Sequence, residues 1–396
     1  MSTRSYLLIS HQKELLQFYE TNKLVPWLCF DTEFVGEKRF LTRICLIQAV
    51  TPHGNYLIDP FEIKDLSPFL DLLADPNICK ITHAGDNDYR LFYTHFDVVP
   101  RNVFDTQVAA AFAGYKYPVS FKKLVENELR LSLSKGYAVA DWEARPFNSQ
   151  QLSYALDDVL PLYELWQALT EKLKQKDRLH WAAEECARWE DPAFYARDPH
   201  QEALSSGLMK ALNTREQVFL LRLFAWRRQI ASQKDYSKEM VLPSKLIGTI
   251  VKSVSSGRDA LRQNRRIPEK IVNQYGAEFE RLYRTPATDD ERAVLDQVQP
   301  EEMENPREEI LIEMLNLLVK QKSFENGISP ALVIARNALA RLKSDPEAIE
   351  EYLGNGWRRQ LLGERFVEWL VNFDQLQLDI NDGSIELRIM NDADYH

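Results

Sequence analysis

Short apolar runs bounded by turns open the chain, and a helical spacing of apolar residues replaces them further along. Each run has the length of a β-strand and ends at polar or turn-forming residues. The runs are Trp27–Phe30, Arg43–Gln48, Tyr56–Ile58, Ile78–Thr82 and Asn102–Phe104. Turns join the first three, whereas helical sequence follows each of the last two. This order predicts a mixed sheet flanked by helices.

From about residue 150 onward the pattern is helical almost throughout, beginning with the apolar spacing between Gln150 and Leu169. Two stretches rich in proline and charge predict linkers, at 187–208 and 288–307. They divide the chain into an α/β domain and two all-α domains, with a tail in which apolar and polar residues alternate around Asn381-Asp382-Gly383, as in a hairpin. The predicted boundaries are 1–186, 209–287, 308–375 and 376–396.

The composition is that of a globular protein with more than one domain. At 396 residues the chain exceeds a single ordinary core, and 45% of its residues are hydrophobic. No apolar run has the length of a membrane span, and the apolar stretch near the N-terminus is too short for a secretory signal. The four cysteines are widely spaced, without a C-x-x-C pair, which predicts neither a zinc site nor a disulfide framework. Together these features predict a protein of the reducing cytoplasm. We also expect it to be a monomer.

The net charge of −10 conceals a basic segment. Between Lys210 and Arg284 there are 16 Lys and Arg against 7 Asp and Glu, a local net charge of +9 that leaves −19 for the rest. Such asymmetry is typical of a chain with a nucleic-acid-binding region. The basic residues that we expect to contact phosphates are Arg227, Arg228, Lys245, Arg262, Arg265, Arg266 and Lys270. The alternative is a set of merely solvated helix faces.

Candidate chemistry begins with Asp31 and Glu33, which stand two residues apart at the end of an apolar strand. Residues at i and i+2 of a strand point to the same face, so both carboxylates project together. Grouped carboxylates repel each other unless they are protonated or neutralised, and a hard divalent cation neutralises them well. By itself the pair is also compatible with a solvated strand end.

Two later motifs hold further carboxylates. Asp88 lies in His83-Ala-Gly-Asp-Asn-Asp88, at a junction from strand to helix, where its alternative role is to cap the helix. Tyr154 and Asp158 are four residues apart and share a helix face, with Asp157 as a competing neighbour. His83 is expected to be structural.

The order Asp-x-Glu, then Asp, then Tyr-x-x-x-Asp resembles the tyrosine-bearing branch of the DEDD exonuclease superfamily, and more widely bacterial ribonuclease D. Supporting signatures are Arg43–Gln48, Phe104–Gln107, Asp141–Pro146 and Gln151–Val159. The stretch Lys135–Ala140 departs from the pattern, because relatives usually have Ser after the Lys. Leu220–Arg228 and Gly356–Leu361 lie in segments that resemble two HRDC domains, and the resemblance covers about residues 5–372.

The resemblance implies a ribonuclease H-like exonuclease domain followed by two helical HRDC domains. It implies that Asp31, Glu33, Asp88 and Asp158 hold two divalent ions, Mg²⁺ or Mn²⁺, and that Tyr154 orients the attacking water. It also selects Asp158 over Asp157. The implied activity is that of a 3′→5′ exoribonuclease that releases nucleoside 5′-monophosphates from RNA such as tRNA precursors. A DNA exonuclease and a non-catalytic nucleic-acid-binding scaffold remain as alternatives.

Overall fold

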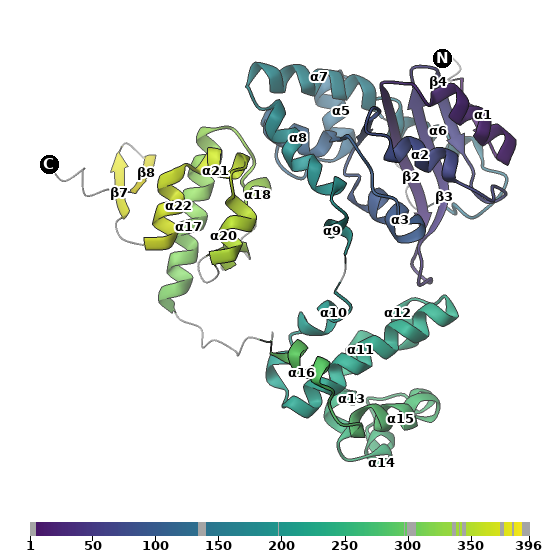
Figure 1. The fold of residues 1–396 in the computed structure, drawn as a ribbon, viewed down its shortest axis with the longest axis vertical. Helices are drawn as coiled ribbons and strands as arrows, with labels where there is room; N and C mark the ends of the chain where they lie inside the picture. Colours follow the sequence, from purple (N-terminus) through teal and green to yellow (C-terminus); the bar gives the residue numbers. More distant parts are fainter. Residues whose placement is uncertain are drawn as a thin grey trace. The chain divides into compact units, whose positions relative to one another are not determined.

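The computed structural model describes residues 5–133, 140–196, 198–296, 298, 306–334, 338–339, 341–342, 346–372, 376–381 and 384–389. Lys135–Val139 of the departing stretch lie outside these residues. The described chain forms two compact units, each with an apolar core of its own (Figure 1). The first unit holds the residues up to Glu33, residues 44–195 and the residues from 306 on. The second holds residues 34–43 and the helical segment that begins at Ala196.

A six-stranded mixed sheet forms the centre of the first unit. The five apolar runs account for five of its strands, and Leu7–Ile9 forms a sixth that the runs did not mark. Its strands stand in the order β1-β4-β3-β2-β5-β6. β1 is parallel to β4, β4 is antiparallel to β3, and β2, β5 and β6 run parallel to one another. The strands are β1 (Leu7–Ile9), β2 (Trp27–Val35), β3 (Arg43–Thr51), β4 (Gly54–Ile58), β5 (Cys79–Thr82) and β6 (Val103–Asp105).

Helices cover the sheet and complete its core (Figure 1). Phe30 of β2 illustrates the packing, because its ring meets those of Phe69, Tyr89 and Phe92 on two helices. All four aromatic side chains are fully buried. The helices of this part are α1 (Gln12–Asn22), α2 (Ser67–Ala74), α3 (Asp86–Phe96), α4 (Thr106–Ala113), α5 (Phe121–Leu129), α6 (Ser149–Val159), α7 (Leu162–Gln175) and α8 (Leu179–Ala187).

The helical stretch expected between Gln150 and Leu169 is broken between α6 and α7. Pro161 stands at the N-cap of α7. Proline has no N–H to donate to the preceding turn, so α6 ends before it and a new helix begins after it. The break separates α6, which carries Tyr154 and Asp158, from α7, whose Leu165, Leu169 and Leu173 face the core.

Part of the stretch expected to be a linker at 187–208 is folded. The short helix η1 (Arg188–Glu190) and α9 (Pro192–Tyr195) continue from α8 in the first unit, and α10 (Gln201–Leu204) lies in the second. Trp189 and Tyr195 are buried in the core of the first unit. Their large rings bury apolar area, which a scan for proline and charge overlooks.

The second unit has its own apolar core. Trp226, Tyr275 and Phe279 meet edge to face or tilted in it, with ring centroids 4.8–6.2 Å apart. Thr288 caps a short helix within the second expected linker. The helices are α11 (Thr214–Lys234), α12 (Lys238–Val241), α13 (Ser244–Val254), α14 (Arg258–Gln263), α15 (Glu269–Arg284) and α16 (Asp289–Leu295).

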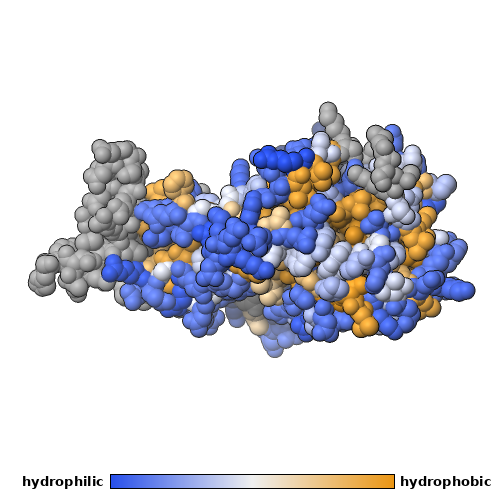
Figure 2. Space-filling view, turned by 90° about the horizontal axis from the view of Figure 1, so that it is seen from above, coloured by the Kyte–Doolittle hydropathy of each residue, from blue (hydrophilic) through white to orange (hydrophobic). Residues whose placement is uncertain are grey.

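The helical part from 306 on belongs to the first unit and shares its core. Its helices are α17 (Pro306–Glu325), α18 (Pro330–Val333), α20 (Pro346–Leu353), α21 (Trp357–Leu362) and α22 (Glu364–Asn372). The strands β7 (Leu376–Asn381) and β8 (Ser384–Ile389) then pair antiparallel, which is the hairpin that the alternating sequence predicts. No helix among the described residues combines the length and apolarity that a bilayer crossing requires. Figure 2 shows hydrophilic and hydrophobic residues interspersed over one face.

Candidate active site

The site starts within β2, where Asp31 and Glu33 follow the buried run Leu28–Phe30. The strand does not end at Asp31, as the sequence had suggested, but continues to Val35. Both acidic side chains are half-buried, whereas Thr32 between them is buried. The alternation is that of a strand with two different faces. On the neighbouring strand β3, the fully buried Gln48 directs its amide nitrogen at a carboxylate oxygen of Glu33, 3.4 Å away.

Asp88 is buried in the first turn of α3. Its carboxylate accepts a hydrogen bond from the hydroxyl of Thr32, which links α3 to β2. Gly85 stands at the N-cap of α3, and a Cβ there would come within 2.6 Å of the Thr82 hydroxyl oxygen. Glycine is therefore required for this close approach. The sequence left open that Asp88 merely caps the helix. Its hydrogen bond with Thr32 is a contact beyond the helix, which capping does not account for.

A buried carboxylate outside the predicted set fixes the start of α3. Asp105 accepts hydrogen bonds from the backbone N–H groups of Gln107, Val108 and Gly85, at 2.8, 3.3 and 2.8 Å. The first two bonds cap α4, and the third ties that cap to the turn before Asp88. Asp105 belongs to the Phe104–Gln107 signature, so its position was marked in the sequence but its role was not.

Tyr154 and Asp158 lie one turn apart on α6, and the phenol hydroxyl donates a hydrogen bond to the Asp158 carboxylate. Asp158 is half-buried, and its charge raises the pKa of both Asp31 and Glu33. Asp157 is buried. The structure thus brings Asp31, Glu33, Asp88, Tyr154 and Asp158 together from three elements that are distant in sequence.

The segment before α6 is held by the Asp141–Pro146 signature. The Arg145 guanidinium donates to Asp59, to the backbone oxygen of Cys45 at 2.8 Å and to that of Trp142 at 2.8 Å. The Trp142 ring in turn lies 6.2 Å from the Tyr154 ring, measured between centroids. These contacts orient the start of α6 and support Tyr154.

Burial raises the pKa of every carboxyl in the site, and repulsion from the other site carboxyls raises it further for Asp31 and Glu33. Burial raises the pKa of Asp31 well above its usual value, and the charges of Asp88, Asp158 and Glu33 raise it further. Burial, then Asp158 and Asp88, raise the pKa of Glu33 to about 8. Burial raises the pKa of Asp88 to about 7, against the hydrogen bond from Thr32, and that of Asp158 to about 6, against the bond from Tyr154. Such a set holds an excess of negative charge that a cation relieves.

His83 has a structural role, as expected. Its two ring nitrogens lie 2.9 Å from the Thr106 hydroxyl oxygen and 3.1 Å from the Val119 carbonyl oxygen. Burial lowers its pKa, which favours the neutral ring. Both nitrogens are thereby engaged within the fold.

The donor set suits divalent metal ions. All donors are carboxylate oxygens, which hard cations such as Mg²⁺ and Mn²⁺ prefer. Burial, and then repulsion between the carboxylates, raises the pKa of Asp31 and Glu33, and a bound cation would favour their charged forms. Across the described residues, no group of three or more acidic, histidine or cysteine side chains is placed to hold a metal ion as it stands. Mg²⁺ commonly takes only one or two carboxylates and keeps several waters, so a complete protein cage is not required.

Comparisons with known proteins agree with this geometry. Residues 6–174 match the family model of a 3′-5′ exonuclease, and residues 216–282 match that of the HRDC domain. A ribonuclease D of Gluconacetobacter diazotrophicus is 30% identical over 364 residues, which cover 90% of this chain and 91% of that protein. A ribonuclease D of a Shewanella species is 31% identical over 339 residues, covering 85% and 83%. The chain belongs to the ribonuclease D family.

The fold agrees with this membership. The crystal structure of Escherichia coli RNase D superimposes with a TM-score of 0.81 at 24% identity, covering 94% of this chain and all of that one. As a ribonuclease D family member the chain is a 3′→5′ exoribonuclease. This finding favours RNA over the DNA alternative, and the convergence of four carboxylates argues against a non-catalytic scaffold.

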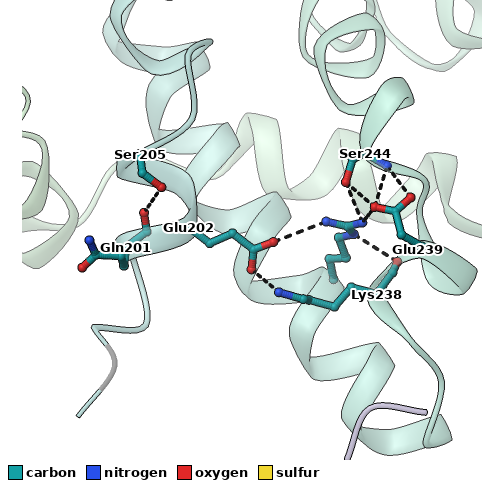
Figure 3. A network of polar contacts seen from close by, with 7 residues as sticks. Gln201, Glu202, Ser205, Lys238, Glu239 and Ser244 are labelled. Carbon is teal, nitrogen blue, oxygen red and sulfur yellow. Dashed lines mark hydrogen bonds and ion pairs between the residues drawn. The ribbon is translucent and has the colours of Figure 1, made fainter. Parts of the chain in front are cut away.

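One predicted RNA contact requires correction. Arg227 is 2% exposed, and its guanidinium is bound by Glu239 at 2.6 Å, by Ser244 at 3.0 Å and by the Lys238 carbonyl oxygen at 3.1 Å. Figure 3 shows Glu202, Lys238, Glu239 and Ser244 around this network. A buried guanidinium needs such partners, and breaking them to reach a phosphate would leave buried charge unpaired. Arg227 therefore stabilises the second unit, and we remove it from the RNA-binding set.

The other predicted contacts remain accessible on the second unit. Arg228 is half-buried, whereas the remaining five are exposed: Lys245, Arg262, Arg265, Arg266 and Lys270. Four of these exposed residues lie between Arg262 in α14 and Lys270 in the first turn of α15. They define the basic α14–α15 surface: Arg262, Arg265, Arg266 and Lys270.

Proposed function

We propose that this ribonuclease D family member releases nucleoside 5′-monophosphates from RNA 3′ ends by a two-metal mechanism, with Asp31, Glu33, Asp88 and Asp158 as the metal ligands. The observation that carries the proposal is the shared electrostatics of these carboxyls. Each has a raised pKa, and those of Asp31 and Glu33 are raised by the charges of the other site carboxyls. The charge of two such ions, Mg²⁺ or Mn²⁺, would be largely offset by these four carboxylates.

The protein contributes a rigid arrangement of carboxylates around the scissile phosphate. Two divalent ions held by these carboxylates would supply an activated water and stabilisation of the leaving oxygen. Asp31 and Glu33 are held on one strand, Asp88 is oriented by Thr32, and Asp158 is oriented by Tyr154. Since three elements fix these groups before RNA arrives, little reorganisation is required during the reaction.

Tyr154 is assigned to orienting the attacking water by a hydrogen bond. Burial raises the pKa of its phenol above the usual value, and the Asp158 charge and hydrogen bond raise it further. A phenol whose pKa is raised stays protonated at neutral pH, so it is a poor general base. While the hydroxyl donates to Asp158, its oxygen nevertheless keeps a lone pair that can accept a hydrogen bond from water.

The substrate that we propose is a structured RNA precursor with a 3′ extension, such as a tRNA precursor. The E. coli relative is described as an exoribonuclease involved in structured RNA processing. Residues 1–186 would act as the exonuclease domain, 209–287 as an HRDC domain that binds RNA, and 308–375 as a second HRDC-like domain. The basic α14–α15 surface and Lys245 then hold the RNA by phosphate contacts. The enzyme works as a cytoplasmic monomer in this proposal.

Incubation with a 3′-extended RNA hairpin and a matched DNA tests the proposal, with Mg²⁺, Mn²⁺ or EDTA present. We expect stepwise shortening of the RNA from its 3′ end and release of nucleoside 5′-monophosphates, which EDTA stops. Internal cleavage, faster DNA shortening or turnover in EDTA would each contradict it. Sedimentation of the enzyme with and without RNA measures its oligomeric state.

A further inference from the structure

One helical segment of the first unit contacts both the helical part from 306 on and the helix that carries Asp88. The segment is α8 with η1, Leu179–Glu190, which we call the bridge segment. Both sets of contacts lie within the first unit. On both sides the contacts include hydrogen bonds as well as ring contacts.

On one side, the bridge segment binds the start of α21. Glu184 accepts a hydrogen bond from the backbone N–H of Trp357, at 2.9 and 3.1 Å from its two oxygens. Glu185 accepts from the Trp357 indole N–H at 3.0 Å and pairs with Arg358 at 2.8 Å. A Cβ on Gly356 would lie 2.2 Å from a Glu184 oxygen, so glycine permits this approach.

Trp357 is the anchor of this contact. Its side chain is fully buried, and its ring meets Phe112 of α4 edge to face, with centroids 4.7 Å apart. A buried tryptophan whose N–H has a charged acceptor combines large apolar burial with a fixed orientation. Trp357 therefore joins α21 to the bridge segment by both apolar burial and a hydrogen bond to a charged acceptor.

On the other side, the bridge segment holds the start of α3 by two routes. The Trp189 indole N–H donates to Asp86 at 3.3 Å, and its ring lies 5.8 Å from that of Tyr89. Through the second route, the sulfur of Cys186 accepts a hydrogen bond from the backbone N–H of Asp105, at 3.4 Å. The Asp105 carboxylate in turn binds the N–H of Gly85. Both routes end within three residues of Asp88.

We infer that Trp357 and Glu185 are positioning residues for the reaction: docking of α21 on the bridge segment fixes the start of α3 and so the place of the Asp88 carboxylate. The helical part from 306 on then supports the metal site in addition to any contact with RNA. Since Asp88 is a proposed metal ligand, the inference rests on the proposed function. Networks of packed and hydrogen-bonded residues transmit such effects with a modest energy, so a measurable but partial defect is expected.

The test uses full-length variants and a trinucleotide RNA, which offers a scissile bond and few other contacts. Trp357→Phe keeps an aromatic ring but loses the N–H that binds Glu185. Glu185→Gln keeps an acceptor but loses the charge opposite Arg358. We expect kcat on the trinucleotide to fall about five-fold in each, with KM unchanged, and Mn²⁺ affinity measured by calorimetry without RNA to fall by a similar factor.

Arg359→Ala is the matched control, because Arg359 lies on the same helix α21 but pairs with Glu364 of α22 at 2.6 Å, within the helical part from 306 on. It should leave both quantities unchanged. If Trp357→Phe fails to fold by circular dichroism, Glu185→Gln decides the question. Unchanged kcat and Mn²⁺ affinity in the folded variants would overturn the inference, as would a defect confined to KM on long RNA. A wild-type enzyme without Mg²⁺-dependent turnover would instead overturn the proposed function.

Discussion

The hydroxyl of Thr32 donates a hydrogen bond to the Asp88 carboxylate, and so joins the strand that carries two of the acidic residues to the helix that carries a third. Both residues are buried, so the bond is protected from competing water. Groups that orient a metal ligand typically change metal affinity or activity by roughly 10–100-fold when they are removed.

Thr32→Val should therefore weaken Mn²⁺ binding and lower kcat by roughly 10-fold, since valine has the same shape but no donor. Thr32→Ser restores the hydroxyl and should recover most of both quantities. Calorimetry with Mn²⁺ and single-turnover hydrolysis of a labelled RNA measure the two effects. Equal behaviour of the valine and serine variants would show that the hydroxyl is not what matters.

Removal of one ligand should abolish turnover without abolishing RNA binding. In Asp31→Ala and Asp158→Asn the site loses a charge that offsets the cations, while the basic α14–α15 surface stays intact. We expect no Mg²⁺-dependent release of nucleoside monophosphates and RNA affinity within about two-fold of wild type. Asp71→Asn, an exposed position on α2, is the control and should remain fully active. Retained turnover in either site variant would remove that carboxylate from the mechanism.

Tyr154→Phe separates catalysis from binding. The ring and its contact with Trp142 remain, whereas the hydroxyl that donates to Asp158 is lost. Loss of one positioned hydrogen-bonding group should slow the single-turnover rate by about 10²-fold with little change in RNA affinity. An unchanged rate would mean that the water is oriented by other groups.

The sequence predicted the sheet, the helices and the acidic residues because each leaves a local pattern. Asp31 and Glu33 alternate with buried strand residues, and Tyr154 and Asp158 share a helix face. The prediction that Asp88 lies beside these residues came from the family resemblance, because no local pattern specifies a contact between residues so far apart in the sequence.

The supporting contacts were not predictable in this way. Asp105, Gln48 and Trp357 lie in stretches that the resemblance had marked, yet their partners are distant in sequence. Arg227 was assigned to RNA from charge, whereas the structure buries it among four acceptors that surround its guanidinium. Charge along a sequence does not reveal which cations the fold itself uses.

The raised pKa values predict an unusual dependence of stability on pH in the metal-free enzyme. Unfolded Glu and Asp titrate near 4, whereas the pKa is about 8 for Glu33, about 7 for Asp88 and about 6 for Asp158 in the fold. Between these values the folded state binds more protons than the unfolded state, so stability falls as pH rises. In EDTA, the stability that these groups contribute should be fully present below about pH 4 and should be lost progressively as pH rises through about 6, 7 and 8.

Mg²⁺ should reverse this trend, because the cation replaces protons that the site otherwise needs. Its effect on Tm should be small at pH 5 and larger at pH 8, where the carboxyls are ionised. Thermal melts of wild type and Glu33→Gln, with EDTA or Mg²⁺, measure both effects. The Gln variant removes a carboxyl whose pKa is raised to about 8, and should flatten the decline of Tm between about pH 6 and 8 in EDTA. A wild-type Tm that rises over this range without metal would contradict the assignment.

The basic α14–α15 surface predicts a salt-dependent contribution to RNA affinity. Replacing Arg262, Arg265 and Arg266 by alanine removes three exposed positive charges without touching the buried Arg227 network. Each lost phosphate contact should reduce the slope of log affinity against log salt by about 0.7 for single-stranded RNA. The triple variant should therefore bind RNA more weakly at low salt and approach wild type at high salt, while hydrolysis of a trinucleotide stays unchanged. Lys174→Ala removes an exposed charge from α7 in the other unit and should leave the slope unaltered. Equal slopes in wild type and the triple variant would place the RNA contacts elsewhere. The slope is the decisive quantity, because a loss of affinity through partial unfolding does not by itself change it.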